Sequence, residues 1–131
     1  MSEEAVTGRW AASIDLAVGT PLVLAPARRA AIEHHFAAVT AANPKLWNGP
    51  FFLFEEARFD GDTFRATARP TDYATFLDWR DRGFPGEIHT HIFPVPALTT
   101  ADRRLLVGVM GRHTANAGLA YPPSGSFDHL D

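Results

Sequence analysis

The chain has 131 residues, of which 46% are hydrophobic and 21% charged, and its formal net charge is −3. These values are typical of one soluble globular domain, and the acidic balance argues against nucleic acid or a membrane surface as a partner. The absence of cysteine excludes disulfides and thiolate metal sites. The start Met1-Ser2-Glu3-Glu4 lacks a signal-peptide pattern, and no apolar run approaches the roughly 20 residues of a membrane span. We therefore expect a cytoplasmic protein.

The first third of the chain predicts a strand and a helix. Residues 14–18 alternate between branched apolar side chains and others, which indicates a half-buried strand, and residues 22–24 can add a second short one. Pro26 stands at the favoured first position of a helix and Asn43-Pro44 ends it, so we expect a helix over residues 26–42. Its apolar face is formed by three side chains at helical spacing, Ile32, Phe36 and Val39.

The middle of the chain predicts a β-hairpin followed by a second helix. Residues 51–59 form the first strand, Asp60-Gly61 is a strong turn signal, and residues 64–69 alternate between apolar and polar or cationic side chains. Thr71 can cap the second helix, with an aspartate in its first turn, and Gly83 ends it.

Two histidines, His89 and His91, lie one residue apart within residues 88–98. That segment predicts an edge or bulged strand, because its two prolines cannot donate to a ladder. On a strand both imidazoles face the same side and can bind one metal ion. The alternative is a structural pair of histidines, which a motif of only two residues favours.

The stretch 105–125 predicts a buried strand and a ligand site. Residues 105–110 form an apolar run with turn signals on both sides, which indicates a strand covered on both faces. A polar, glycine-rich loop follows, and such a loop at the end of a buried strand predicts a ligand site, with an ordinary surface loop as the alternative. We expect ligand contacts from Arg112, His113, Thr114, Asn116, Tyr121, Ser124 and Gly125, with Arg80 and Arg69 as outer contributors.

Three segments resemble a group of bacterial Nudix hydrolases in order and spacing. They are Trp47-Asn48-Gly49, the segment 71–80 (TDYATFLDWR), and residues 110–128, which contain MGRHTANAG and YPPSGSFD. The resemblance covers residues 47–131. It implies the mixed-sheet α/β architecture of the Nudix family as a single domain over residues 1–131. It also implies a small-molecule nucleoside-diphosphate derivative as the partner and Mg²⁺ or Mn²⁺ as the cofactor.

The catalytic signature of the Nudix family is missing from this sequence. In the family, a glycine is followed six residues later by a glutamate and then by a helix segment, Arg-Glu-apolar-x-Glu-Glu-x-Gly, whose glutamates hold the divalent metals. This chain has no Arg-Glu pair, its last glutamate is Glu87, and only six residues follow Gly125. It therefore contains no such ligands for Mg²⁺ or Mn²⁺.

Three functions remain open after this comparison of motifs. The first is a Nudix-type hydrolase by ancestry, truncated before its catalytic helix and inactive as this chain. The second is a non-catalytic nucleotide or nucleotide-sugar binding module, and the third is a small protein with a metal bound by histidines. A missing catalytic helix would expose an apolar sheet face, so association into a homo-oligomer is also expected.

Overall fold

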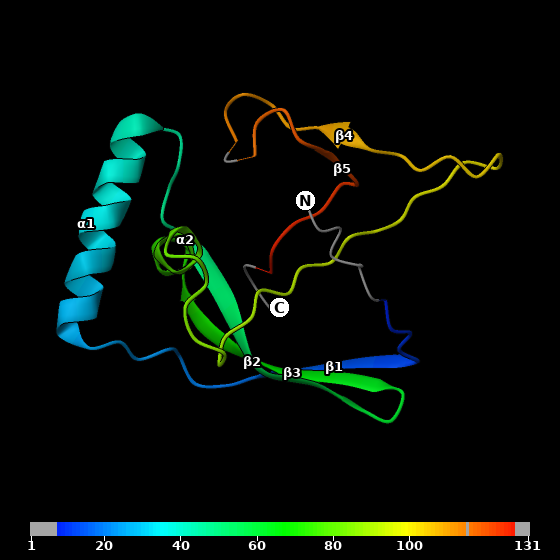
Figure 1. Cartoon of the computed structure of the whole chain (residues 1–131), viewed down its shortest axis with the longest axis horizontal. Helices are drawn as coiled ribbons and strands as arrows, with labels where there is room; N and C mark the ends of the chain where they lie inside the picture. The colour runs from blue at the N-terminus through cyan, green and yellow to red at the C-terminus, as the bar shows by residue number, and fades with distance from the viewer. Residues whose placement is uncertain (1–7, 115, 128–131) are drawn as a thin grey trace.

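The computed structural model describes residues 8–114 and 116–127. It is a mixed α/β structure in which two helices lie beside a three-stranded sheet, and a small two-stranded sheet stands apart from them (Figure 1). The elements in chain order are β1 (Ser13–Val18), α1 (Pro26–Ala42), β2 (Pro50–Asp60), β3 (Thr63–Asp72), α2 (Tyr73–Asp81), β4 (Gly108–Val109) and β5 (Ala120–Tyr121). No helix in the described ranges is long and apolar enough to cross a membrane.

The larger sheet has the order β1-β3-β2, with β3 in the centre. β2 and β3 form the predicted antiparallel hairpin, and β1 pairs with β3 in parallel, so that Ile14 lies opposite Phe64. The turn between β2 and β3 uses Gly61 at a φ of 59°, a conformation that glycine adopts without steric cost. The expected short strand at residues 22–24 is absent. A single backbone hydrogen bond from Leu22 to Pro70 extends the β1 side of the sheet instead.

The core lies on both faces of β2. Four consecutive residues of this strand, 51–54, are buried, because alternate side chains enter two different clusters. Phe51 and Leu53 pack with α2 and with the apolar face of α1, which confirms the predicted roles of Ile32, Phe36 and Val39. Phe52 and Phe54 pack on the opposite face against Ala66, Ala68, Leu16, Phe64, Ile92 and Phe127.

The start of α2 joins two of the three segments that resemble Nudix hydrolases. Asp72, and not Thr71 as predicted, is the N-cap: its carboxylate accepts a hydrogen bond of 2.9 Å from the backbone N–H of Thr75. Asn48 accepts from the backbone N–H of Ala74 at 2.8 Å and donates to Asp72 at 3.2 Å. The segments 47–49 and 71–80 therefore meet at the start of α2 and together form its cap.

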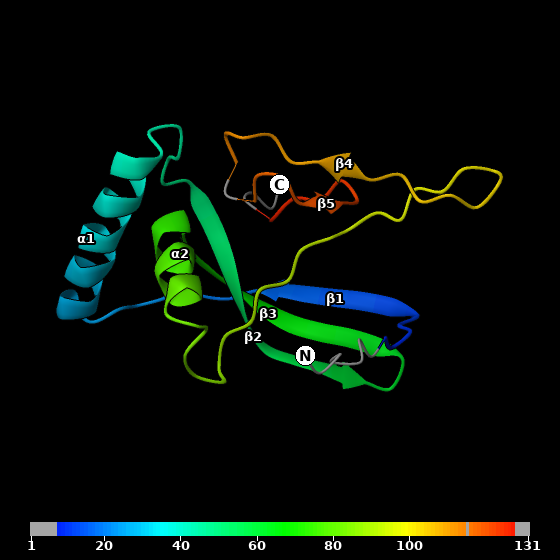
Figure 2. The same cartoon turned by 45° about the horizontal axis from the view of Figure 1, so that its top comes forward.

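Two predicted strands in the second half of the chain are wrong. Residues 105–110 contain only the two strand residues of β4, and their apolar side chains are exposed: Leu106 by 52% and Val109 by 74%. Residues 88–98 form no strand, and their backbone pairs with the described sheet through one isolated bridge between Phe54 and Thr90. An apolar run indicates burial only where another part of the chain covers it, and the segment 96–109 instead projects away from the sheet and helices (Figure 2).

Candidate functional site

Three adjoining cavities lie between the start of α2 and the loop that joins β4 to β5. The largest, here called the aromatic cavity, has a volume of about 520 Å³. It is lined by Tyr73, Phe76, Arg80, Phe84, His91, Phe93, Val95, Asn116, Tyr121, Pro122 and Ser126. This volume falls within the range of about 300–1,000 Å³ that is usual for small-molecule sites.

The other two cavities continue from the aromatic cavity toward the end of α1. The middle cavity, of about 400 Å³, shares Tyr73 and Ser126 with the aromatic one and also contains Trp47 and Thr114. The cationic cavity, of about 370 Å³, shares Lys45 and His113 with the middle one and adds Asn43, Pro44 and Arg112. The described residues that line the three cavities include three fixed cations, namely Arg80, Lys45 and Arg112, and no carboxylate.

The residues predicted for the ligand site are spread over these cavities. Arg80, Asn116 and Tyr121 lie in the aromatic cavity, His113 and Thr114 in the middle one, and Arg112 in the cationic one together with His113. Ser124 and Gly125 line none of the three. Arg69 is held elsewhere, where it donates to Glu55 at 2.9 Å and to the carbonyl of Thr20 at 2.6 Å.

Sequence reasoning missed several residues of this site. Tyr73 and Phe76 fall in the predicted second helix and Phe93 in the predicted strand, and none was expected to contact a ligand. Phe76 is a core residue against which Tyr73 packs, and both also line the aromatic cavity together with Phe93. Lys45 was not considered as a ligand contact, although it is the only lysine in the chain and lies in two of the cavities. Its position directly after the proline that ends α1 was the only available signal.

The loop 111–119 is held by its own hydrogen bonds and not by the predicted buried strand. Gly118 donates to the carbonyl of Met110, and Met110 donates to that of Leu119, both at 2.9 Å. The hydroxyl of Thr114 donates to the carbonyl of Gly111 at 2.8 Å. These bonds close the hairpin between β4 and β5, so the cavity residues of the loop are positioned by a tight turn.

His91 forms part of the aromatic wall. Its ring centroid lies 4.7 Å from that of Phe76 and 4.9 Å from that of Phe93, and its Nε2 shares a 3.2 Å hydrogen bond with the hydroxyl of Ser126. Burial lowers the pKa of His91, because a charged imidazole loses hydration there. The imidazole is therefore neutral at pH 7 and offers one donor and one acceptor.

Arg80 supplies the charge of the aromatic cavity. Its Nε donates to Asp81 at 2.9 Å, and its guanidinium lies 6.0 Å from the ring centroid of Phe76. The ion pair engages Nε, and the two terminal nitrogens make no hydrogen bond to any residue within the described ranges. A guanidinium held by one nitrogen keeps the fork that recognises carboxylate or phosphate in a bidentate manner.

The structure places His89 and His91, the two histidines considered for one metal ion, in different surroundings. His89 lies 3.0 Å from the carboxylate of Glu55 and lines a different cavity, of about 280 Å³, whereas His91 lines the aromatic cavity. Within residues 8–114 and 116–127, no group of three or more histidine, cysteine, aspartate or glutamate side chains is arranged to hold a metal ion.

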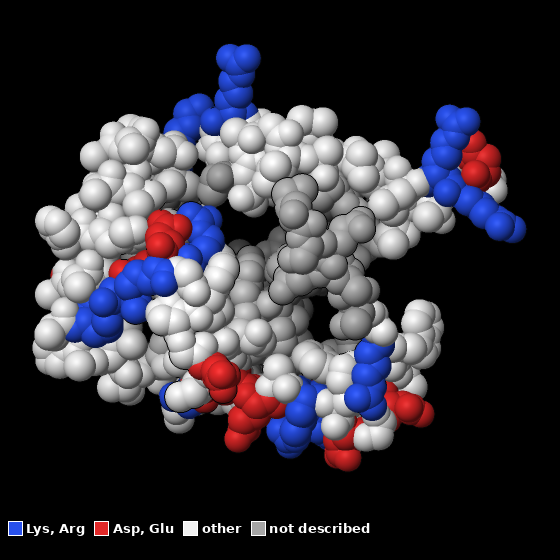
Figure 3. Space-filling model, viewed as in Figure 1, with Lys and Arg blue, Asp and Glu red and all other residues white. Residues whose placement is uncertain are grey.

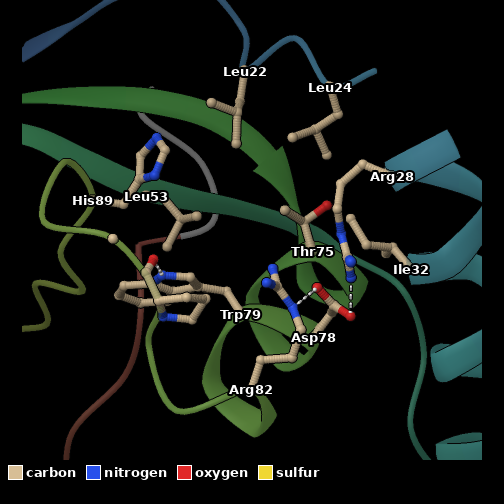
Figure 4. Close-up of a pocket in the computed structure, with 12 residues that line it drawn as sticks. Leu22, Leu24, Arg28, Ile32, Leu53, Thr75, Asp78, Trp79, Arg82 and His89 are labelled. Atoms are coloured by element: carbon tan, nitrogen blue, oxygen red, sulfur yellow. Dashed lines mark hydrogen bonds and ion pairs between the residues drawn. The ribbon is translucent and has the colours of Figure 1, made fainter. Parts of the chain in front are cut away.

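The cavity beside His89 contains a buried ion-pair cluster that links the two helices. Asp78 of α2 is buried and bonds to Arg28 of α1, and its other oxygen accepts from Arg82 at 2.9 Å (Figure 4). The two arginines reach the carboxylate from opposite sides. Because both cations are already paired with Asp78, we read this cluster as structural.

Comparison of this chain with protein-family models, with curated proteins and with solved structures finds no match. The site is therefore interpreted from its own geometry and from the resemblance of its motifs.

Proposed function

We propose that this chain binds a nucleoside-diphosphate compound, such as a nucleotide sugar, across the three adjoining cavities. The observation that carries the proposal is the order of the lining residues along the three cavities. They are mostly aromatic at one end and cationic at the other, and the described lining residues include no carboxylate. A ligand with a flat ring at one end and negative charge further along matches this order.

The aromatic cavity suits a nucleobase. Tyr73, Phe76 and Tyr121 offer rings on which a base can stack, an interaction worth about 1–3 kcal/mol per base. The amide of Asn116 and the hydroxyl of Ser126 can donate to or accept from the edge of the base. The neutral state of His91 adds a further neutral polar group without adding charge to this end of the site.

The cationic cavity suits the diphosphate. Arg112 can donate two parallel hydrogen bonds to one phosphate, while Lys45 acts as a point charge beside it. His113 lies between the middle and cationic cavities and can donate a hydrogen bond to the bridging region. Because no described lining residue is a carboxylate, none of these residues opposes the phosphates with a like charge.

The resemblance to Nudix hydrolases supports the same class of ligand, and we propose that this chain is a Nudix-type hydrolase by ancestry. The family's Mg²⁺ or Mn²⁺ requires carboxylate oxygens, and the cavity linings contain none, so the described residues do not fit that cofactor. We therefore propose binding without hydrolysis.

Titration calorimetry with a nucleoside diphosphate and a nucleotide sugar, at one fixed salt concentration, tests the proposal. Arg112→Ala should weaken binding by about 1.5–3 kcal/mol, the range for hydrogen bonds to charged groups. The matched control is Arg104→Ala, which removes an exposed arginine that lines none of the three cavities and should leave the affinity unchanged. Undetectable binding by the wild type, or equal affinity of wild type and Arg112→Ala, would overturn the proposal.

A further inference from the structure

The segment 96–109, here called the apolar arm, is exposed along its whole length. Five large apolar side chains on it face solvent, namely Leu98, Leu105, Leu106, Val107 and Val109. Only its tip is charged, and the surface behind the tip is mostly uncharged (Figure 3). The arm is a narrow ribbon held by a bridge between Thr99 and Leu105 and by a hydrogen bond from Leu106 to Leu98.

A second apolar surface lies on the outer edge of the larger sheet. β1 is the end strand of that sheet and pairs only with β3 among the described strands. Ile14 is 69% exposed and Val18 is 56% exposed on this strand. An end strand with apolar side chains and unpaired backbone groups is a ready partner for another extended segment.

The amount of exposed surface is larger than a compact chain of this mass requires. The chain exposes 9582 Å², whereas size scaling gives about 6,800 Å² for a compact monomer of 14.3 kDa. The excess is on the order of 2,800 Å², while a standard stable interface buries roughly 800 Å² of each partner. The excess exposed area is thus larger than the area that a standard interface buries on each chain.

We propose that two copies of this chain form a dimer in which the apolar arm of each copy packs against β1 of the other. A twofold arrangement lets each chain donate an arm and receive one, so that the contact closes and does not propagate. The occupant of the β1 edge is thus a second copy of the same polypeptide. This dimer does not depend on the ligand proposed above, because neither the arm nor β1 lines the three ligand cavities.

Sedimentation equilibrium on the whole chain, from low micromolar to sub-millimolar concentration, tests the dimer. The expected mass is twice 14.3 kDa. Leu106→Glu on the arm and Ile14→Glu on β1 should each raise the dissociation constant by about tenfold or more, because each places an unpaired charge in the apolar contact. Ile88→Glu is the matched control, since Ile88 is 71% exposed and belongs neither to the apolar arm nor to the β1 edge. All three sites are exposed, and far-UV circular dichroism would verify that each variant folds.

Cross-linking separates the proposed contact from any other dimer. Because the chain contains no cysteine, an Ile14→Cys chain and a Leu106→Cys chain can be mixed and treated with a short thiol-specific cross-linker. We expect a joined pair of the two different chains, and no such product when Ile88→Cys replaces Ile14→Cys. A monomeric mass at all concentrations, aggregates without a defined mass, or a dimer unaffected by either glutamate variant would overturn the proposal.

Discussion

At the scale of single residues, the position of His91 ties the aromatic cavity to the pH dependence of stability. Burial lowers its pKa in the folded protein, whereas an unfolded chain has a histidine pKa of about 6.5. The unfolded state therefore takes up the proton first on acidification. The corresponding stability is present above about pH 6.5 and is lost as the pH falls below it.

His91→Phe tests this linkage, because a phenyl ring can keep the packing against Phe51, Phe76 and Phe93. Arg80 is the one permanently charged residue among the described residues that line this cavity, and it stays protonated between pH 5 and pH 7. Denaturant unfolding between pH 7 and pH 5 should show a shallower loss of stability in His91→Phe than in the wild type. The exposed His34→Gln is the control and should retain the wild-type slope. An identical slope in His91→Phe would contradict the prediction.

The carboxylate of Asp72 shows how a single residue begins an element. Burial alone would raise its pKa, but hydrogen bonds from Thr75 and Asn48 and the charge of Arg29 outweigh it, and the pKa is lowered. Asp72→Ala should lose about 0.5–2 kcal/mol of stability at pH 7, the range for N-cap residues. The difference from wild type should shrink below about pH 4, where the unfolded chain and then the native carboxylate are protonated.

Thr71→Val is the matched control for the cap of α2. The Thr71 hydroxyl is buried and has no hydrogen-bond partner among the described residues, so an isosteric apolar side chain removes nothing that stabilises the fold. Unfolding in urea should therefore give Thr71→Val a stability equal to or above that of wild type. If Thr71→Val lost as much stability as Asp72→Ala, then Thr71 and not Asp72 would be the cap.

At the scale of elements, Asp78 joins α1 to α2. Removing one partner of a fully buried ion pair costs about 3–5 kcal/mol. Arg28 and Arg82 remain partly exposed, so water can solvate them once the carboxylate is gone, and we expect Asp78→Ala to cost roughly 2 kcal/mol.

An exposed ion pair on the apolar arm is the comparison for the buried ion pairs of Asp78. Arg104 and Asp102 lie 2.8 Å apart on the apolar arm, with side chains 83% and 59% exposed. Asp102→Ala should change stability by less than about 0.5 kcal/mol, as is usual for surface substitutions. Thermal unfolding of both variants measures the contrast, and an equal loss in the two would show that burial of Asp78 does not decide its contribution.

At the scale of the whole molecule, the sequence correctly predicted those helices and strands whose ends are marked by a proline or a turn motif. The helix over residues 26–42 matches α1 because a proline opens it and Asn43-Pro44 closes it, and both act on the adjacent backbone. The hairpin of β2 and β3 was likewise set by a turn signal between two apolar patterns. The run 105–110 was misread because burial depends on segments distant in sequence, and no described segment covers it.

The candidate site was predictable only in part, for the same reason. The loop that carries Arg112, His113 and Thr114 was identified from its own composition, and these residues do line cavities. Lys45 and Tyr73 reach the same cavities from the end of α1 and the start of α2. The positions of Lys45 and Tyr73 depend on the hydrogen bonds that join segments 47–49 and 71–80 at the cap of α2. Local sequence patterns do not reveal this contact between distant segments.

We expect the intact molecule to bind a nucleotide sugar without hydrolysing it. A ligand that binds only the folded state at 100 times its dissociation constant stabilises the fold by about 2.7 kcal/mol, so a nucleotide sugar should raise the unfolding temperature. Hydrolysis in the Nudix manner needs carboxylates that hold metal beside the diphosphate. The sequence lacks the glutamate signature, and none of the cavity-lining residues that the structure describes is a carboxylate. With Mg²⁺ or Mn²⁺ added, chromatography of the nucleotide sugar should show stabilisation without product. Steady product formation that a chelator abolishes would show that other residues of the chain supply the metal ligands.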